Sequence, residues 1–377
     1  MNLPPIPNAR PAPSWKRIVA VRLGIYLLLV AAAVVAWLAW SWNTPYRGFP
    51  GEGVYVDIPR GASVQHIAAL LEQNGVVRSS MSFEALARWR GRMPQAGEYF
   101  FDHARTPVEV FTTLAEGRIY TRRVTIPEGL SMFEIAEQLE REKFTHRENF
   151  LAVARDPAQV RDIAPDAPSL EGFLFPDTYA FPRRVTAQEI AQAMVRRFRE
   201  VWASFPVEGR NPRGLSALRL VTMASLVEEE TGARDERPLV AGVFYNRLER
   251  RMHLQCDPTV LYALRLAGRP KATLLLRDLR FDSPYNTYRN PSLPPGPIAN
   301  PGRAALEAAL FPAETEFLYF VSDAQGGHFF ARTLAEHNQN VARYRRLQAE
   351  AAANANSNSV RPGSNAPPAG KEADRFQ

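Results

Sequence analysis

The sequence has little of what metal and redox sites require. Among its 377 residues are a single cysteine, Cys256, and six histidines. One cysteine rules out an intramolecular disulfide and a cysteine-rich zinc site. The histidines form no His-Glu-x-x-His pair, and His328 and His337 stand alone near the end of the chain, where lone histidines are more often structural than metal-ligating. We therefore expect neither a metal nor a cofactor.

Several common catalytic motifs are missing as well. The chain has no G-x-x-x-x-G-K-[ST] phosphate loop, no G-x-G-x-x-G after a strand and no G-x-S-x-G nucleophile elbow. These absences argue against a P-loop enzyme, a dinucleotide-binding domain and an α/β-hydrolase. The net charge is +7, but the basic residues form no dominant block. This surplus fits an anionic partner such as a membrane surface, a cell wall or nucleic acid, and equally a solvated, arginine-rich surface.

One segment is long and apolar enough to cross a membrane. Residues 23–40 carry no charge, and their number is about what a helix needs to span the hydrocarbon core. Residues 18–21 extend the run beyond Arg22, whose long side chain can reach the interface. We predict a transmembrane helix over residues 18–42. Three tryptophans lie at its far end, where an aromatic belt is expected: Trp37, Trp40 and Trp42.

The charges on either side of this segment predict its orientation. Basic residues precede the span, and none follows it before Arg47. The positive-inside rule therefore places residues 1–17 in the cytoplasm as a short tail and the rest of the chain outside. A cleaved signal peptide is the alternative, but the segment ends in tryptophans and lacks the small residues of a cleavage site. We favour a retained single-pass anchor, followed by a Pro- and Gly-rich linker over residues 43–53.

A repeat follows the linker. Residues 58–72 and 126–140 share about half of their positions at one fixed offset. Each copy has a short apolar run, a Pro-x-Gly turn, a serine suited to cap a helix, and apolar residues at helical spacing. Strand, turn and capped helix resemble the start of a LysM-like unit, a module that often binds peptidoglycan sugars. The alternative is a β-turn-α block with a packing role only. We assign residues 54–165 to this LysM-like region.

The remaining elements predict a mixed α+β fold. A strand is expected over residues 96–101 and a helix over 107–114, between the two copies. Residues 166–351 are assigned to a second, mixed α+β domain, because their loops are rich in Pro, Asn, Tyr and Gly. Its expected helices cover residues 187–201, 216–231, 237–250, 301–310 and 333–351, with a strand over 317–322. Residues 352–377 have too few apolar side chains to fold and are expected to be disordered.

One acidic helix end is the candidate for chemistry. At about 100° per residue, Glu229 points away from the apolar stripe of helix 216–231, and Glu228 and Glu230 lie on opposite flanks about 160° apart. These two carboxyls therefore cannot act as a pair, but either can lie at the edge of a cleft. Glu230 lies between the stripe and Leu226, and burial against apolar groups raises the pKa of a carboxyl, as a general acid requires. A solvated acidic helix end is the alternative, and periodicity alone favours it.

The residues around this helix end resemble one known family. The run MASLVEEET at residues 223–231 is similar to that of the endolytic murein transglycosylases, the YceG-like family. The similarity continues in order over about 150 residues, and the upstream anchor and LysM-like region also suit the family. Further matching stretches are residues 170–179, 243–248, 254–260, 283–288, 293–302 and 318–321. Two positions depart from the family pattern without removing a functional group: Glu229, where lysine is common, and Gly232.

The resemblance implies an activity and a site. Enzymes of this family cleave the β-1,4 bond between N-acetylmuramic acid and N-acetylglucosamine without water, and leave a 1,6-anhydro end. Their catalytic glutamate is the second of an E-x-E-T pattern, which falls on Glu230. The matching polar loops supply the candidate sugar contacts: Glu228, Gln255, Asp257, Tyr285, Asn286, Thr287 and Tyr288. The alternative for Asn and Asp beside Pro is the capping of turns and helices.

The resemblance also implies a place and partners, and two rival functions stay open. It implies an inner-membrane enzyme with a periplasmic catalytic domain over residues 166–351, which cuts nascent strands, sets their length and meets peptidoglycan synthases but no nucleic acid. A lysozyme-type muramidase would need a second carboxylate, for which Asp257 is the candidate. A non-catalytic peptidoglycan-binding scaffold built on the repeat would not need Glu230.

Overall fold

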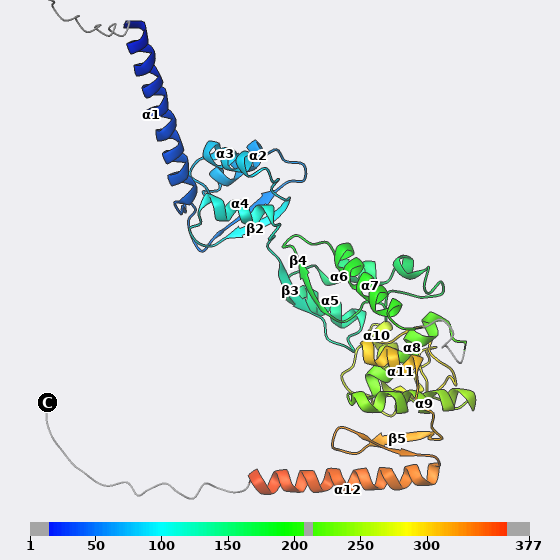
Figure 1. The fold of residues 1–377 in the computed structure, drawn as a ribbon. Helices are drawn as coiled ribbons and strands as arrows, with labels where there is room; N and C mark the ends of the chain where they lie inside the picture. Colours follow the sequence, from blue (N-terminus) through cyan, green and yellow to red (C-terminus); the bar gives the residue numbers. More distant parts are fainter. Residues whose placement is uncertain (1–14, 207–213, 360–377) are drawn as a thin grey trace, which may run out of the picture. The chain divides into compact units, whose positions relative to one another are not determined.

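The computed structural model describes residues 15–206 and 214–359, with side chains up to residue 350. The chain divides into an N-terminal and a C-terminal unit, with the boundary between Arg122 and Arg123. The described part is mostly helical, with two-stranded sheets (Figure 1). The predicted α+β class is confirmed at this level.

The N-terminal unit starts with one long apolar helix. This helix, α1 (Trp15–Asn43), encloses the predicted span over residues 18–42, and none of its residues is buried. Within the described residues, it is the one helix long and apolar enough to cross a membrane. Residues 1–14 of the predicted cytoplasmic tail lie outside the described residues.

A strand–helix–helix–strand motif forms the rest of this unit, together with a further helix. Its elements are β1 (Val54–Ile58), α2 (Val64–Gln73), α3 (Ser80–Arg90), β2 (Gly97–Phe101) and α4 (Pro107–Ala115). β1 and β2 are antiparallel, with Val56 opposite Tyr99. The alternation of apolar and polar residues along β1 buries Val56 and Ile58 and exposes Asp57. The buried strand residues share one core with residues of α2, α3 and α4.

Local signals decide where these helices begin. The side chain of Ser63 accepts a hydrogen bond from the N–H of His66 at 3.2 Å, as predicted for the capped helix of the first copy. Thr106 and Glu109 form a complete capping box at the start of α4. Helix α3 was not predicted, because exposed Met81 and Trp89 blur its apolar spacing.

The C-terminal unit opens with the second copy of the repeat. Its elements are β3 (Arg122–Thr125), α5 (Met132–Arg141), α6 (Arg147–Ala154) and β4 (Thr178–Phe181). β3 pairs with β4, so this copy repeats the strand–helix–helix–strand order of the first. The closing strand lies beyond residue 165, where the sequence placed a domain boundary. The two copies thus belong to different units. The sequence did not indicate the pairing of β3 with β4, because strands far apart in the chain pair without a local pattern.

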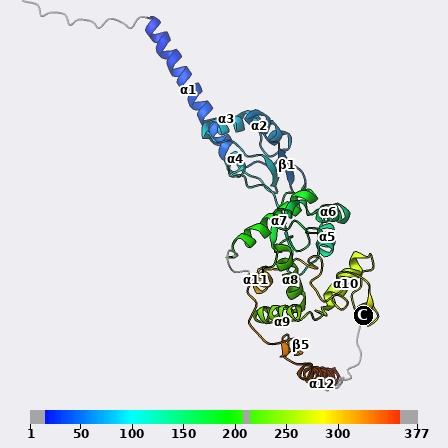
Figure 2. The same ribbon diagram turned by 90° about the vertical axis from the view of Figure 1, so that its right-hand side faces the viewer.

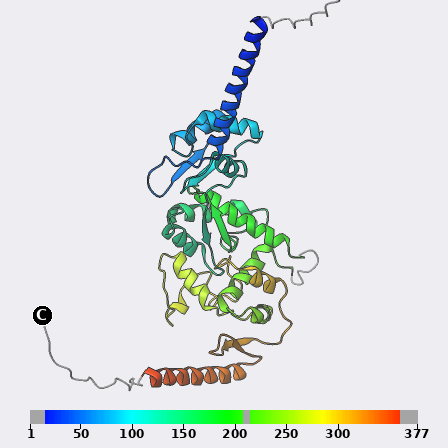
Figure 3. The ribbon, with the colours of Figure 1, turned by 60° about the vertical axis from the view of Figure 1, so that its left-hand side comes forward.

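The rest of the unit is helical, with one hairpin. The elements are η1 (Pro157–Val160), α7 (Ala187–Ala203), α8 (Ala217–Glu230), η2 (Arg234–Glu236), α9 (Arg237–Glu249), α10 (Asp257–Leu266), η3 (Asp278–Arg280), α11 (Arg303–Leu310), β5 (Tyr319–Ser322), β6 (His328–Ala331) and α12 (Leu334–Ser359). α8 contacts α9, α10 and α11 (Figure 2). The β5–β6 hairpin contacts α12, which runs past the predicted end at residue 351 (Figure 3). Residues 360–377 of the predicted tail lie outside the described residues.

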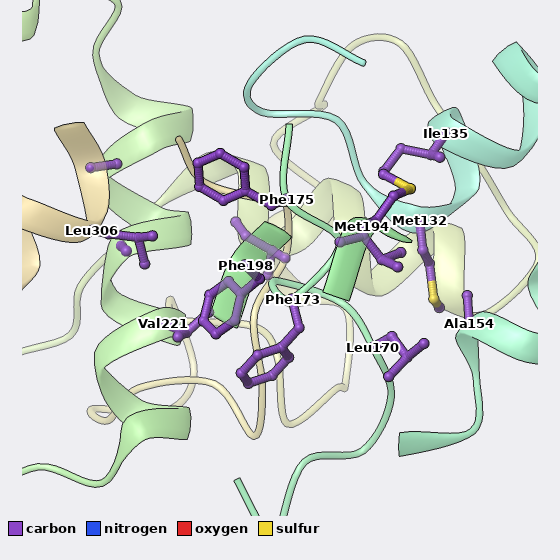
Figure 4. Packing of buried hydrophobic residues seen from close by; sticks show 14 of the residues in the cluster. Met132, Ile135, Ala154, Leu170, Phe173, Phe175, Met194, Phe198, Val221 and Leu306 are labelled. Atoms are coloured by element: carbon purple, nitrogen blue, oxygen red, sulfur yellow. The ribbon is translucent and has the colours of Figure 1, made fainter. Parts of the chain in front are cut away.

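One apolar core joins the second repeat copy to these helices. Figure 4 shows Met132 and Ile135 of α5, Met194 and Phe198 of α7, and Val221 of α8 in this core. Phe173 and Phe198 pack edge to face, with ring centroids 5.0 Å apart. Because α8 is packed into this core, its C-terminal end is held in a fixed position.

Candidate active site

The helix that carries the acidic run is buried along most of its length. All residues from 220 to 227 are buried, including Thr222 and Ser225. The hydroxyl of Ser225 donates to the carbonyl of Thr222 and accepts from the N–H of Ile298 at 3.1 Å, which satisfies this buried polar group. The helix is therefore covered on more than one side, as Leu218 and Leu226 predicted. Its last turn, which holds the three glutamates, emerges at the edge of the core.

Glu230 ends α8 and is partly buried. Burial is the main cause that raises the pKa of its carboxyl above the ordinary value, and the charge of Asp257 adds to the increase. A hydrogen bond with the Cys256 thiol acts in the opposite direction, as do the positive charges of His328 and Arg247. Such a carboxyl holds its proton more tightly than a solvated glutamate and still reaches solvent. This combination is what a general acid requires.

Arg247 is a buried cation that the sequence reasoning did not single out. Its Nε donates to the carbonyl of Leu318 and its Nη1 to that of Leu254, each at 2.7 Å. Burial lowers the pKa of Arg247, and the charge of Glu230 raises it. The side chain joins α9 to β5 and to the loop before Cys256. The one sequence signal for Arg247 was its place in the matching stretch 243–248. Local periodicity could not reveal its burial, because its acceptors lie on other segments of the chain.

The loop that faces Glu230 is held by hydroxyl groups. The N–H of Cys256 donates to the hydroxyl oxygen of Thr287 at 3.0 Å. The hydroxyl of Thr259 donates to the carbonyl of Cys256 at 2.6 Å and lies 2.9 Å from that of Thr287. Gln255 has a positive φ of 54°, so the chain turns sharply just before Cys256. These bonds fix the Cys256 thiol against Glu230.

The predicted sugar contacts separate into exposed and buried side chains. Gln255 and Asp257 are exposed, and Tyr288 is partly buried. The hydroxyl of Tyr288 donates to Oδ1 of Asp257 at 2.5 Å, and burial raises the pKa of Tyr288. The charge of Asp257 raises the pKa of Glu230, and the charge of Glu230 raises the pKa of Tyr288, so both side chains lie close to Glu230.

Three other predicted contacts are buried and bonded within the protein. Nδ2 of Asn286 donates to the carbonyls of Leu279 and Phe281, and its Oδ1 accepts from the N–H of Tyr288. Thr287 is bonded to the Cys256 loop, as described above. Tyr285 packs on Tyr262 with ring centroids 5.2 Å apart, and burial raises its pKa to about 12. All three side chains support the loops that carry the exposed residues.

Glu228 lies in a different environment from Glu230. Its carboxylate accepts from Nη2 of Arg237 at 2.5 Å and from the N–H of Gly302 at 2.9 Å. Burial raises its pKa, while the hydrogen bond from Gly302 and the charge of Arg237 lower it. Glu228 thus joins the end of α8 to the starts of α9 and α11. The two carboxyls face different partners, in line with their predicted angular separation.

The histidines considered as metal ligands have other partners. Nδ1 of His328 lies 2.7 Å from Oε2 of Glu236, and the ring of His337 stacks on Tyr319 with centroids 5.2 Å apart. In the part of the chain that the structure describes, no three His, Cys, Asp or Glu side chains gather as a metal site would require.

Comparison with known proteins identifies the family. The sequence pattern of the YceG-like family matches residues 56–343. The chain belongs to the YceG-like family. The endolytic murein transglycosylase of Bacillus subtilis (strain 168) is 36% identical over 308 residues, which cover 77% of this chain and 84% of the relative. That of Streptococcus pneumoniae serotype 2 (strain D39) is 31% identical over 324 residues, which cover 77% of this chain and 58% of the relative.

A solved structure agrees with this assignment. The crystal structure of a YceG-like protein from Listeria monocytogenes matches the chain with a TM-score of 0.52 and 32% identity, and the match covers 77% of this chain and 99% of that one. The family predicted from the residues around Glu230 is therefore confirmed.

In this YceG-like chain, a hollow of about 350 Å³ adjoins the last turn of α8. Glu229, one of the two departures from the family pattern, lines it. Burial and the neighbouring carboxylates raise the pKa of Glu229 to about 7. The other lining residues come from the second repeat copy, from α10 and from the loops on either side: Gly129, Ser131, Glu134, Pro258, Leu261, Tyr262, Arg265, Lys271, Ala272 and Ile298. The hollow thus offers polar and charged groups around Glu229, whereas Glu230 does not line it.

Glu171 is a second residue that the sequence reasoning missed in this YceG-like site. Only 1% of the residue is exposed, and burial raises its pKa to about 8. Its carboxyl accepts from the N–H of Met132, from Nδ2 of Asn300 at 2.8 Å and from the hydroxyl of Tyr262 at 3.0 Å. It therefore connects α5, the loop before α11 and α10 beneath the hollow. Its only signal was its place in the motif at residues 170–179.

Proposed function

We propose that this chain is an endolytic murein transglycosylase, an enzyme that cuts peptidoglycan glycan strands internally. The observation that carries the proposal is Glu230, one partly buried carboxyl with a raised pKa, at the position of the family's catalytic glutamate. The similarity to an endolytic murein transglycosylase at 36% identity supports the same activity. The reaction is that of a carbon–oxygen lyase acting on a polysaccharide.

In the proposed mechanism, Glu230 acts first as acid and then as base. Its protonated carboxyl gives its proton to the glycosidic oxygen, while the bond between this oxygen and C1 of N-acetylmuramic acid breaks. The carboxylate then takes the proton from the C6 hydroxyl, whose oxygen bonds to C1 and closes the 1,6-anhydro ring. No water is consumed, and the carboxyl ends the cycle in the form in which it began. One carboxyl suffices, unlike the pair that ordinary glycosidases use.

The surrounding side chains have two proposed roles. The exposed or partly buried residues Gln255, Asp257 and Tyr288 contact the sugar, with Asp257 placed to stabilise the positive charge that develops at C1. The buried residues Tyr285, Asn286 and Thr287 and the paired Glu228 position these groups. No cofactor is required by this mechanism.

The rest of the chain fits an enzyme that works beside a membrane. We infer that α1 is a retained single-pass anchor in the inner membrane, with a cytoplasmic N-terminus and a periplasmic catalytic domain. The strand–helix–helix–strand motif of the N-terminal unit is the proposed LysM-like module, which would hold the glycan. Cutting nascent strands at this place would set their length and would bring the enzyme beside a peptidoglycan synthase.

The decisive experiment is to digest purified peptidoglycan with the full chain in detergent and to weigh the products. The wild type is expected to leave 1,6-anhydromuramyl ends, which are lighter than reducing ends by one water. Glu230→Gln is expected to form these ends about 10²–10⁴-fold more slowly. Glu307→Gln, at an exposed position on α11, serves as the matched control and cuts like the wild type.

Other outcomes lead to the rival functions. Reducing ends would identify a muramidase and would direct attention to Asp257 as its second carboxylate. Retained binding without cleavage by the wild type would contradict the enzyme and favour a peptidoglycan-binding scaffold. A Glu230→Gln variant that cuts like the wild type would exclude Glu230 as the acid.

A further inference from the structure

The C-terminal end of α1 is attached to α3 by several contacts. The hydroxyls of Ser41 and Ser82 lie 2.6 Å apart, and Nε1 of Trp42 donates to the carbonyl of Ser82 at 3.0 Å. Trp42 also stacks on Trp89, with ring centroids 5.6 Å apart. Figure 1 shows α3 beside this end of α1. The position of α3 is therefore fixed relative to the last turn of the apolar helix.

These contacts determine the depth of α3 in relation to the bilayer. The charge-free residues 23–40 span about 27 Å as a helix, close to the roughly 30 Å of a hydrocarbon core. With this stretch across the core, Trp40 lies at its edge, and Ser41 and Trp42 lie among the headgroups. Ser82 bonds directly to both, so the first turn of α3 lies at headgroup level.

Large apolar side chains are exposed on the outer face of α3 at this level, among arginines. Met81 is 75% exposed and Trp89 is 70% exposed, and Met93, just beyond the helix, is 61% exposed. The opposite face, with Phe83 and Leu86, fills the core of the unit. Among the described residues that follow α1 in this unit, the one other exposed large apolar side chain is Ile119, at 41%. Such a patch is typical of an interaction surface.

The charge around this patch is positive. Residues 78–93 contain one acidic residue, Glu84, against four arginines, which are Arg78, Arg88, Arg90 and Arg92, for a net charge of +3. Glu84 is paired with Arg88 at 2.5 Å. Arg78 lies over the ring of Trp40 at 5.7 Å, and Arg90 over that of Trp89 at 5.4 Å. Arginines that flank aromatic rings at headgroup level are placed to bind lipid phosphates.

We propose that α3 is a second membrane contact, which lies on the leaflet from which α1 emerges. The side chains of Met81, Trp89 and Met93 enter the headgroup region, and the arginines bind the phosphates of anionic phospholipids. This inference rests on the proposed role of α1 as a retained anchor. Its consequence is that the strand–helix–helix–strand motif is held against the bilayer and does not swing freely on a flexible tether.

The test uses the full chain in vesicles of phosphatidylglycerol and phosphatidylethanolamine with brominated acyl chains. The natural Cys256 is buried, so a new exposed cysteine can be labelled selectively with an environment-sensitive fluorophore. The probes are Met81→Cys and Trp89→Cys. Val30→Cys, within α1, is the positive control, and Asp57→Cys is the negative control, because Asp57 points away from the core that β1 shares with α3.

The proposal predicts a blue shift of the emission and quenching by the brominated lipid at positions 81 and 89, as at position 30, and neither effect at position 57. The shift at positions 81 and 89 is expected to decrease when Arg90 and Arg92 are both changed to Gln or when the vesicles contain no anionic lipid. Quenching at position 30 without quenching at 81 and 89 would overturn the contact and leave the anchor intact. Absence of quenching at position 30 would overturn the anchor and, with it, the contact.

Discussion

The carboxylate of Glu228 and the guanidinium of Arg237 form a buried ion pair, with 2.5 Å between Oε1 and Nη2 and both side chains 5% exposed. Glu128 lies 3.7 Å from the same nitrogen. Nε and Nη1 of Arg237 have no hydrogen-bond partner among the described residues, so Glu228 supplies its closest charge partner. The pair joins the end of α8, two residues before Glu230, to the start of α9.

Replacing Glu228 with Gln should therefore destabilise the protein strongly. The variant keeps an acceptor for the N–H of Gly302 but leaves the charge of Arg237 buried without its main partner, which typically costs about 3–5 kcal/mol. Denaturant unfolding of the C-terminal unit measures this loss. Glu307→Gln, at an exposed position on α11, is the control and should change stability little. Equal stability of both variants would show that the ion pair contributes nothing.

The activity should depend on pH through Glu230. Because burial raises the pKa of this carboxyl, the protonated form persists to a higher pH than in a solvated glutamate. Only that form can donate a proton, so kcat/KM should fall as the pH rises through the raised pKa. This fall is the basic limb of the pH profile of kcat/KM. Glu230→Gln should lose about 10²–10⁴-fold in rate at the optimum. A basic limb at the ordinary pKa of glutamate would contradict the burial of the acid.

Two neighbours should move this basic limb in opposite directions. The charge of Asp257 raises the pKa of Glu230, so Asp257→Asn should shift the limb to lower pH. The Cys256 thiol lowers that pKa by a hydrogen bond, so Cys256→Ala should shift the limb to higher pH, and Cys256→Ser, which keeps a donor, should shift it less. The pH profiles of the three variants measure these shifts. A basic limb that stays in place in Asp257→Asn would contradict the effect of this charge on Glu230.

Glu171 should make stability depend on pH. Its pKa is raised from 4.5 to about 8. Between these two pH values the folded state therefore holds a proton that the unfolded state has released. The contribution to stability is then fully present below about pH 4.5 and decreases, by on the order of a few kcal/mol, as the pH rises to 8. Glu171→Gln keeps an acceptor oxygen for Met132 and Asn300 and turns an amide N–H toward the hydroxyl oxygen of Tyr262, and it should remove this slope. Unfolding free energies at pH 5 and pH 8 measure it, and an unchanged slope in the variant would refute this role.

Thr287 should act on the reaction through position alone. Thr287→Val removes the acceptor for the N–H of Cys256 and leaves that buried donor without a partner, at a cost of about 1–3 kcal/mol. The loop that carries Cys256 and Asp257 should then shift, so that kcat/KM falls and the basic limb moves, because both residues act on the pKa of Glu230. Thr273→Val, at an exposed position, is the control. A changed limb with unchanged stability would point to direct contact with the reacting groups.

The local elements of this protein follow closely from its sequence. The apolar run predicted α1, because an uncharged apolar segment of that length is typical of a helix that crosses a membrane. Ser63 predicted the start of α2, since its side chain satisfies a free N–H at the helix end. The spacing of the three glutamates predicted that Glu228 and Glu230 face different neighbours.

Contacts between distant residues were decided only by the tertiary structure. The pairing of β3 with β4, the burial of Asn286 and Thr287, and the contact of Cys256 with Glu230 join segments that have no common local pattern. Burial sets the pKa values of Glu171 and Glu230, and burial is a property of packing. The sequence by itself therefore determined several of the helices, among them α1, α2 and α8, and the family resemblance of its motifs determined which glutamate to test. The environment that gives that glutamate its raised pKa exists only once α8, α9 and the 255–257 loop are folded together.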